Sequence, residues 1–174
     1  MTAPAGTKAF TTNESLASEL NLQQVIRVVL SEREFADFRI EKSYSVNELY
    51  NDTIATNKNG NDAMTEPDTG VLKYRHKVVG LGDNKYQHTK QNACERVCLY
   101  TTDALVYGLS SKRVFLVFAG DGFRAHNAQG HVGGSTGKMI VRAKHHCTLL
   151  VNPTEKELYS TYRKYLRQIA REES

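Results

Sequence analysis

Side chains that could carry out chemistry are scattered over the later part of this 174-residue chain. Two histidines, or a histidine and a carboxylate, could cleave RNA without a metal if they converged on a phosphate. The candidates for such a pair are His126, His131, His145, His146, Asp103 and Asp121. Their spacing forces no two of them together, so the sequence predicts no catalytic residue and favours a function other than catalysis.

The three cysteines could bind zinc only together with histidine. Cys94 and Cys98 lie four residues apart on a predicted helix, and Cys147 follows the pair His145-His146. Zinc sites usually use pairs of ligands two to four residues apart, but cysteine is also a common small core residue. An odd number of cysteines also argues against a disulfide framework. The sequence therefore favours buried packing and predicts no metal and no cofactor.

The segment GGSTGKM at 133–139 has the composition of a phosphate-binding loop but not its pattern. Val132 stands five residues before Gly137 where a glycine is needed, and Met139 follows Lys138 where serine or threonine is needed. We also expect a strand after it, whereas a phosphate loop leads into a helix. The segment is therefore interpreted as a hairpin tip.

Positive charge is concentrated after residue 70. Residues 1–70 carry 6 Lys and Arg against 11 Asp and Glu, whereas residues 71–174 carry 17 against 8 and contain all six histidines. The later part could bind a polyanion, the two parts or neighbouring subunits could attract each other, or the surface could be uneven by chance. The residues predicted to contact RNA phosphates are Lys73, Arg75, Lys77, Lys85, Lys90, Arg142, Lys144, Arg163, Lys164 and Arg167.

A strand, a glycine turn and a helix should position the first of these cations. The alternation in 71–79 predicts a strand, Gly80 and Gly82 predict a turn that contains Lys85, and a helix is expected over about 89–109. Lysines and free backbone N–H groups at the start of a helix form a corner that suits phosphate.

This stretch, residues 71–99, resembles the C-terminal half of a double-stranded-RNA-binding domain. The matching pieces are Gly80, Gly82, Asn84-Lys85, Thr89-Lys90 and Ala93-Cys94. The resemblance implies that Lys85 and Lys90 hold phosphates across a groove and that RNA is recognised by shape. Tyr86 stands where the family has a second lysine, the turn is about one residue longer, and the family's Gly-Pro-x-His loop is missing. The C-terminal part, interpreted as strand–strand–helix, is similar to the small Alu-RNA-binding subunits of the signal recognition particle.

The rest of the pattern predicts an α+β fold in which helices pack on a largely antiparallel sheet. A helix is expected over 13–30, and 31–46 could hold a short helix or a strand. Strands are expected at 113–119, from Phe123 after a hairpin at Asp121-Gly122, at 138–144 and at 147–151. A C-terminal helix over 153–172, capped by Asn152, buries Leu158, Tyr162, Tyr165, Leu166 and Ile169 and exposes Arg163, Arg167 and Arg171.

Residues 1–12 are interpreted as a polar N-terminal arm and 13–174 as a single domain, with a loop-rich internal boundary at about 51–70. The start of the chain lacks the apolar core of a signal peptide, and no stretch approaches the length that spans a bilayer. We therefore expect a cytoplasmic or nuclear protein, or one assembled in a particle, without a membrane partner.

These observations together predict non-enzymatic binding of structured RNA through a basic surface in residues 71–174. The alternative is a structural subunit of a symmetric assembly such as a viral or phage capsid, which could also contact nucleic acid. The polar arm, the long loops rich in glycine and asparagine, and the segregated charges would all suit contacts between copies. Self-association is therefore expected as well.

Overall fold

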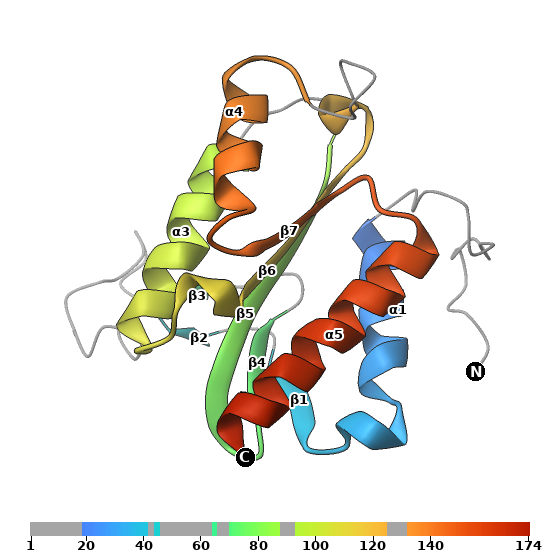
Figure 1. Cartoon of the computed structure of the whole chain (residues 1–174), viewed down its shortest axis with the longest axis vertical. Helices are drawn as coiled ribbons and strands as arrows, with labels where there is room; N and C mark the ends of the chain where they lie inside the picture. The colour runs from blue at the N-terminus through green and yellow to red at the C-terminus, as the bar shows by residue number, and fades with distance from the viewer. Residues whose placement is uncertain (1–18, 42–43, 46–63, 66–69, 88–92, 125–131) are drawn as a thin grey trace.

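A five-stranded sheet forms the centre of the protein in the computed structural model, which describes residues 19–41, 44–45, 64–65, 70–87, 93–124 and 132–174 (Figure 1). The elements are, in chain order, α1 (Glu19–Leu30), the 3-10 turn η1 (Arg33–Phe35), β1 (Phe38–Glu41), β2 (Tyr44–Ser45), β3 (Met64–Thr65), β4 (Val71–Tyr74), β5 (Lys77–Tyr86), α3 (Ala93–Val106), η2 (Ser111–Arg113), β6 (Val114–Ala119), η3 (Asp121–Phe123), α4 (Gly134–Ala143), β7 (Thr148–Val151) and α5 (Glu155–Glu173).

The main sheet is mixed, with the strand order β1-β4-β5-β6-β7. Strands β1, β4 and β5 are antiparallel neighbours, whereas β5, β6 and β7 run parallel. A separate antiparallel pair joins β2 to β3, so three of the five described pairings are antiparallel. The predicted α+β class is confirmed.

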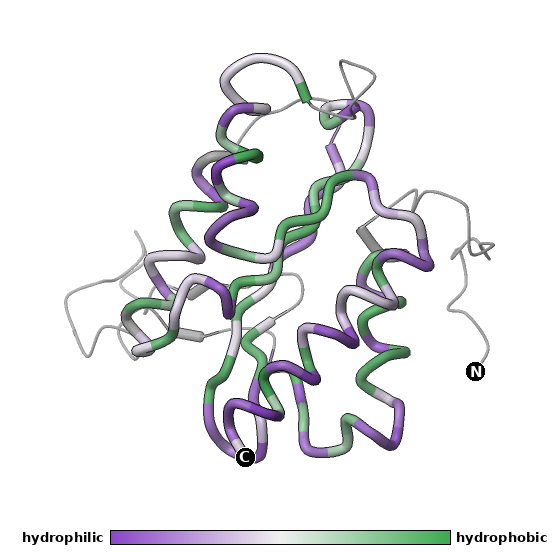
Figure 2. Tube along the Cα trace, viewed as in Figure 1, coloured by the Kyte–Doolittle hydropathy of each residue, from purple (hydrophilic) through white to green (hydrophobic). Residues whose placement is uncertain are grey.

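Helices cover both faces of the sheet and create two hydrophobic cores. On one face, α1 and α5 pack against Phe115, Val117 and Ala119 of β6. On the other face, α3 and α4 pack against the alternate residues of the same strand, including Leu116 and Phe118. All six residues of β6 are buried, as expected for a strand covered on both faces. Figure 2 shows the strands as the most continuous hydrophobic stretch of the chain.

Five predicted elements are confirmed at the level of element type. Helix α1 covers 19–30, α3 lies inside the predicted 89–109, and β6 and β7 match the predicted strands. Helix α5 buries the five residues expected from their spacing. Its N-cap, however, is Thr154, whose side chain accepts from the backbone of Glu157 in a capping box, so the predicted cap at Asn152 is wrong. In the segment after α1, for which the sequence allowed a short helix or a strand, the chain forms the turn η1 and then the strand β1.

The expected strand–turn–helix around Gly80 is wrong in its first two elements. The chain already turns at Arg75 and His76, where Arg75 has a positive φ of 55°, and residues 71–86 form the hairpin β4–β5. Residues 80–86, expected as a turn, belong to β5. Gly80 has an extended backbone because it lies within β5, and the Tyr165 hydroxyl fills the space that a side chain at this position would need.

Two further predictions fail because parallel strands need crossover connections. The expected hairpin at Asp121-Gly122 is the turn η3, and both sides of β6 are occupied by β5 and β7. Residues 138–143 of the expected strand at 138–144 belong to α4, which joins β6 to β7 and buries Gly137, Ile140 and Ala143 at helical spacing. The C-terminal part is therefore helix–strand–helix rather than strand–strand–helix. Residues 134–139 lie inside α4, so the predicted hairpin tip at 133–139 is wrong. The mismatches at Val132 and Met139 still argue against a phosphate loop.

Several predictions fall outside the described residues: the polar arm at 1–12, almost all of the boundary at 51–70, and the residues Lys90, His126 and His131. These predictions stay untested.

Candidate functional site

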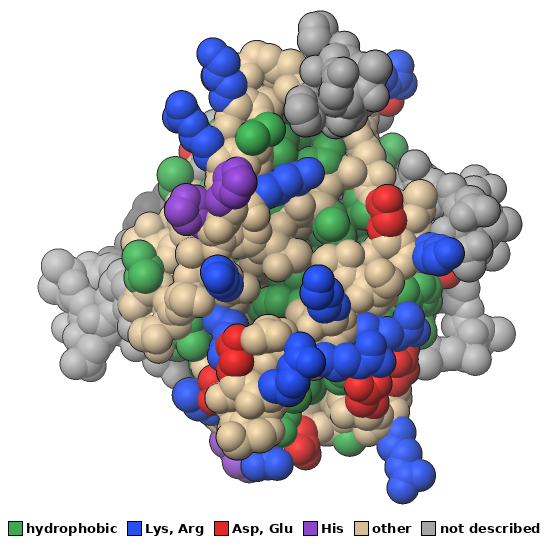
Figure 3. All heavy atoms as spheres, in the orientation of Figure 1, with side chains coloured by type: hydrophobic (Ala, Val, Ile, Leu, Met, Phe, Trp, Pro, Cys, Tyr) green, Lys and Arg blue, Asp and Glu red, His purple; other side chains and the backbone are tan. Residues whose placement is uncertain are grey.

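A groove with a volume of about 480 Å³ opens near the amino ends of β6 and β7. Its walls come from η2, from the turn between α4 and β7, and from α5, and we call it the α5 groove. The charged and imidazole side chains that line it are Lys112, Arg113, Lys144, His145, His146, Lys164 and Glu172. Figure 3 shows this face of the molecule, where lysine, arginine and histidine side chains surround a central hollow.

Hydrogen bonds between the three elements fix the walls of the α5 groove. The Tyr165 hydroxyl of α5 donates to the backbone carbonyl of Arg113 at 2.5 Å. The Ser111 hydroxyl donates to the carbonyl of His146 at 2.8 Å, which joins η2 to the turn before β7. Tyr165 is buried, and burial raises its pKa far above the usual range, so it remains a neutral hydrogen-bond donor. These hydrogen bonds within the protein fix the shape of the groove before any ligand binds.

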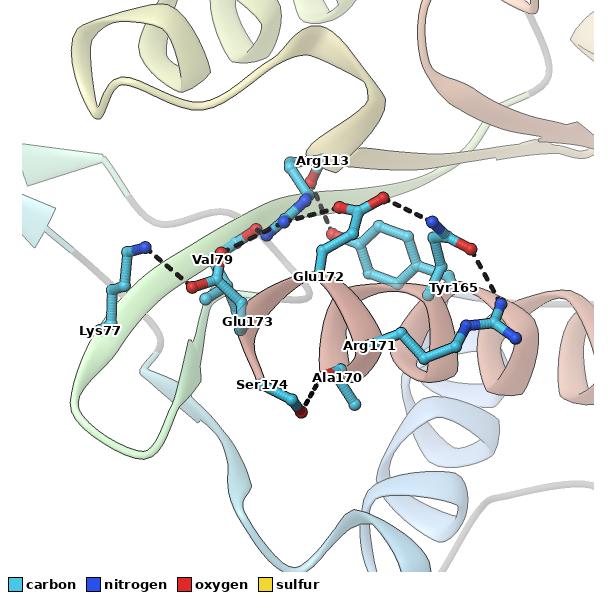
Figure 4. A network of polar contacts seen from close by, with 10 residues as sticks. Lys77, Val79, Arg113, Tyr165, Ala170, Arg171, Glu172, Glu173 and Ser174 are labelled. Carbon is cyan, nitrogen blue, oxygen red and sulfur yellow. Dashed lines mark hydrogen bonds and ion pairs between the residues drawn. The ribbon is translucent and has the colours of Figure 1, made fainter.

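Arg113 is part of this framework rather than a free cation (Figure 4). Its guanidinium donates to the Val79 carbonyl at 3.0 Å, to Glu172 at 2.8 Å and to Glu173 at 3.2 Å, and Lys77 donates to Glu173 at 2.8 Å. Hydrogen bonds from Gln168 and then Arg113 lower the pKa of Glu172, and the bond from Lys77 does most to lower that of Glu173. These contacts hold two carboxylates at the C-terminus of α5, where the helix dipole alone disfavours negative charge.

Three lysines of the groove, Lys112, Lys144 and Lys164, remain exposed and have no ion pair within the described part of the chain. They come from η2, from the end of α4 and from α5, so segments far apart in sequence bring them to one hollow. His145 and His146 are exposed beside them. A second hollow of about 360 Å³ adjoins at His146 and adds Lys138 and Arg142 of α4. The arrangement can neutralise several negative charges of one extended ligand.

Five of the ten residues predicted to contact RNA instead form ion pairs within the protein. Arg163 and Arg167 of α5 are bonded to Glu32 and Glu34 at 2.6 Å each. The remaining pairs are Lys73 with Glu41 at 2.8 Å, Arg75 with Asp37 at 3.3 Å, and Lys77 with Glu173 at 2.8 Å. Four of these five acidic partners belong to residues 1–70, so part of the charge asymmetry reflects attraction between the early and late parts of the chain.

The other predicted residues divide into three groups. Lys144 and Lys164 line the α5 groove, and Arg142 lines the neighbouring hollow. Lys85 lies toward the carboxyl end of β5, opposite Phe118, and therefore far along the sheet from the groove. Lys90 is outside the described residues. Lys112 was missed, although the basic pair Lys112-Arg113 directly before a strong strand signal could have indicated it.

Among the described candidates for acid–base chemistry, His145 and His146 both line the α5 groove, but neither carboxylate candidate lies there. His145 and His146 lie near the amino end of β7, whereas Asp121 follows the carboxyl end of β6 and pairs with Arg124 at 2.9 Å. Asp103 is buried. Of the described cysteine side chains, Cys98 is exposed and Cys147 is buried, and burial raises the pKa of Cys147 to about 11. No cluster of three or more His, Cys, Asp and Glu side chains in the described residues is suited to holding a metal ion.

Comparisons with known protein families, with curated proteins and with solved structures give no match. Among the helices in the described ranges, none has the length and apolar character to cross a membrane.

Proposed function

We propose that the protein binds structured RNA through its phosphate backbone, with the α5 groove as the centre of the contact. The observation that carries the proposal is the convergence of Lys112, Lys144 and Lys164 on one groove with fixed walls. Lys144 and Lys164 have no ion pair in the described part of the chain, so they lose no carboxylate contact when a phosphate approaches, whereas Lys112 also interacts with the charge of Glu172. Arg163 and Arg167 would first have to leave their carboxylates. Arg142 and Lys138 extend the basic surface across the neighbouring hollow. RNA binding fits a protein of the cytoplasm or the nucleus, or one assembled in a particle.

The resemblance to double-stranded-RNA-binding domains gives this proposal limited support. It relies on Lys85 and Lys90 beside a glycine turn, but residues 80–86 form part of a strand. The resemblance itself stays a prediction. The α5 groove is an independent reason to expect a polyanion, because it uses lysines that the resemblance does not include.

Salt dependence tests the electrostatic nature of the contact. Each neutralised phosphate contributes about 0.7 to 0.9 to the slope of log affinity against log salt. Three lysines therefore predict a slope of about 2.1 to 2.7 in magnitude, which corresponds to a roughly 20- to 40-fold loss of affinity between about 50 and 200 mM salt. Fluorescence anisotropy with a labelled RNA hairpin measures this slope. Affinity that does not depend on salt, or no binding at low salt, would contradict the proposal.

Single substitutions locate the contact. Lys144→Gln and Lys164→Gln should each weaken binding of every RNA tested and lower the slope by about 0.7 to 0.9. Lys156→Gln is the matched control, because Lys156 is also exposed on α5 but does not line the groove. An equal loss in the control would mean that overall charge, rather than the groove, determines binding.

A symmetric assembly is the second candidate, and exposed apolar side chains favour it. Leu99 and Leu105 of α3 are 39% and 66% exposed, and Val141 of α4 is 44% exposed. Contiguous apolar surface is typical of faces that become covered by another molecule, and α3 and α4, which carry these residues, pack together on one face of the sheet. Light scattering of the purified protein tests this: particles much larger than a dimer that Leu105→Glu disperses would support assembly, and a monodisperse monomer would contradict it.

A further inference from the structure

The α5 groove contains more kinds of side chain than a row of phosphate contacts needs. A duplex backbone that lies across a surface requires only exposed cations. The groove is instead a hollow whose volume of about 480 Å³ lies in the range of pockets that enclose whole small ligands. Its size and lining therefore indicate which part of an RNA it receives.

Hydroxyl groups lie in the walls between the lysines. Thr148 at the start of β7 and Thr161 of α5 both line the groove, and neither side chain makes a hydrogen bond within the described part of the chain. Both threonines are half-buried, so a ligand in the groove would shield them further from water. Such hydroxyls can both donate to and accept from a ribose 2′-hydroxyl or a base edge.

The groove also offers surfaces for the faces of a base. Ile169 and Cys147 are buried side chains that line it and give it an apolar part. His145 and His146 are exposed at its edge, and imidazole rings stack on unpaired bases. Tyr165 cannot stack, because its ring is buried and its hydroxyl is bonded to Arg113.

We propose that the α5 groove holds one unpaired nucleotide, with its phosphate on the lysines, its ribose beside Thr148 and Thr161, and its base against the histidines and the apolar part. This inference rests on the proposed RNA binding and narrows it: the preferred RNA is a structured one with a bulged or looped-out residue. A free nucleoside monophosphate has the same chemistry, so the experiment must separate the two sources.

Two RNA hairpins that differ by one nucleotide provide the test. One has a fully paired stem closed by a minimal loop, and the other has the same loop and a single-nucleotide bulge in the stem. We expect the bulged hairpin to bind about tenfold more tightly, consistent with the contribution of one stacked base. Thr161→Val and His146→Ala should reduce this preference, and Thr102→Val, at an exposed position of α3, is the control that should keep it. Adenosine monophosphate, added as a competitor, shows whether the groove binds a free nucleotide.

The outcomes separate this inference from the function on which it rests. Equal, salt-dependent affinity for both hairpins would overturn the unpaired-nucleotide inference and leave RNA binding intact. Absence of salt-dependent binding to either hairpin would overturn both. Binding of the monophosphate without binding of either hairpin would also overturn both and would indicate a site for free nucleotides. A bulge preference that Thr161→Val leaves unchanged would contradict the placement of the nucleotide in this groove.

Discussion

The side chain of Tyr165 occupies the space beside the backbone of Gly80. The ring projects from α5 onto β5, and its hydroxyl reaches the carbonyl of Arg113 at the start of β6. One tyrosine therefore ties the C-terminal helix to two central strands directly behind the α5 groove. The glycine is required there by packing, since its own backbone is extended within β5 and needs no unusual conformation.

Gly80→Ala should destabilise the protein by about 1–3 kcal/mol, the usual cost of forcing an extra methyl group into a packed interior. Tyr165→Phe removes the oxygen that the new methyl group meets first, so the two substitutions should couple, with the double variant more stable than the sum of the single effects predicts. Urea unfolding of the four proteins measures the coupling. Strict additivity would show that the tyrosine hydroxyl is not the group that excludes a side chain at this position.

The amphipathic and fully apolar segments could be predicted from sequence because their own residues determine their structure. The periodic apolar face of α5 and the continuous apolar run of β6 are examples, and both are confirmed. The sequence around Gly80 predicts a turn because the residue that explains this glycine, Tyr165, lies 85 residues away. The sequence of α4 predicts a strand because its β-branched residues at 140–141 favour extended structure, and only the parallel pairing of β6 with β7 requires a crossover connection between them.

Contacts between residues far apart in sequence also limited what could be predicted about the α5 groove. A single sequence shows which residues are cationic but not which of them have carboxylate partners, because those partners lie far away in sequence, as Glu32 does from Arg163. Lys144 and Lys164 could be named from the sequence. Their convergence with Lys112 depends on the hydrogen bonds of Ser111 and Tyr165, which no local pattern reveals.

Asn152 connects the carboxyl ends of β6 and β7 and should be sensitive to substitution. Its side chain accepts from the Gly120 N–H at 2.7 Å and donates to the carbonyls of Gly120 at 3.3 Å and Phe123 at 2.9 Å, while its backbone has a positive φ of 43° that asparagine tolerates. Asn152→Ala should cost about 2–4 kcal/mol, from three lost hydrogen bonds and a backbone that alanine disfavours. Asn152→Asp keeps the acceptor and should lose less. Chemical denaturation measures both variants, and a loss below about 0.5 kcal/mol for alanine would contradict this role.

The carboxylates of Glu172 and Glu173 should make stability fall in acid. Both have pKa values below the usual value of 4.5, because hydrogen bonds from Gln168 and Lys77, respectively, and from Arg113 favour their charged forms. A carboxyl group whose pKa is lower in the folded state stabilises the protein above its unfolded pKa. That contribution is lost as the pH falls below about 4.5 and through the folded pKa. Unfolding free energy measured from pH 7 to pH 3 should show this decline, and Glu173→Gln should make it shallower; an unchanged slope would contradict the assignment.

The thiols of Cys98 and Cys147 should differ sharply in reactivity. Cys147 is buried and its pKa is raised to about 11, so at about pH 8 only roughly one molecule in a thousand carries the reactive thiolate. Cys98 is exposed on α3. Alkylation of the native protein followed by peptide mass spectrometry should therefore modify Cys98 and spare Cys147, and both should react in urea. Native labelling of Cys147 at the rate of Cys98 would mean that the floor of the α5 groove opens readily.

Substitutions of two neighbouring residues of α5, Arg163 and Lys164, should have opposite effects on protein stability and on RNA affinity. Arg163 forms a two-pronged contact with Glu32, with distances of 3.0 and 2.6 Å to one carboxylate oxygen, whereas Lys164 lines the groove without an ion pair in the described part of the chain. Arg163→Gln should lower the unfolding free energy by up to about 1 kcal/mol, as expected for a half-exposed pair, and leave RNA affinity unchanged at a given salt concentration. Lys164→Gln should do the reverse, because a lysine without an ion pair contributes little to folding. Each variant loses one positive charge, so each is the other's control for overall charge. Equal losses of RNA affinity in the two variants would show that the contact depends on net charge and not on which cations remain free.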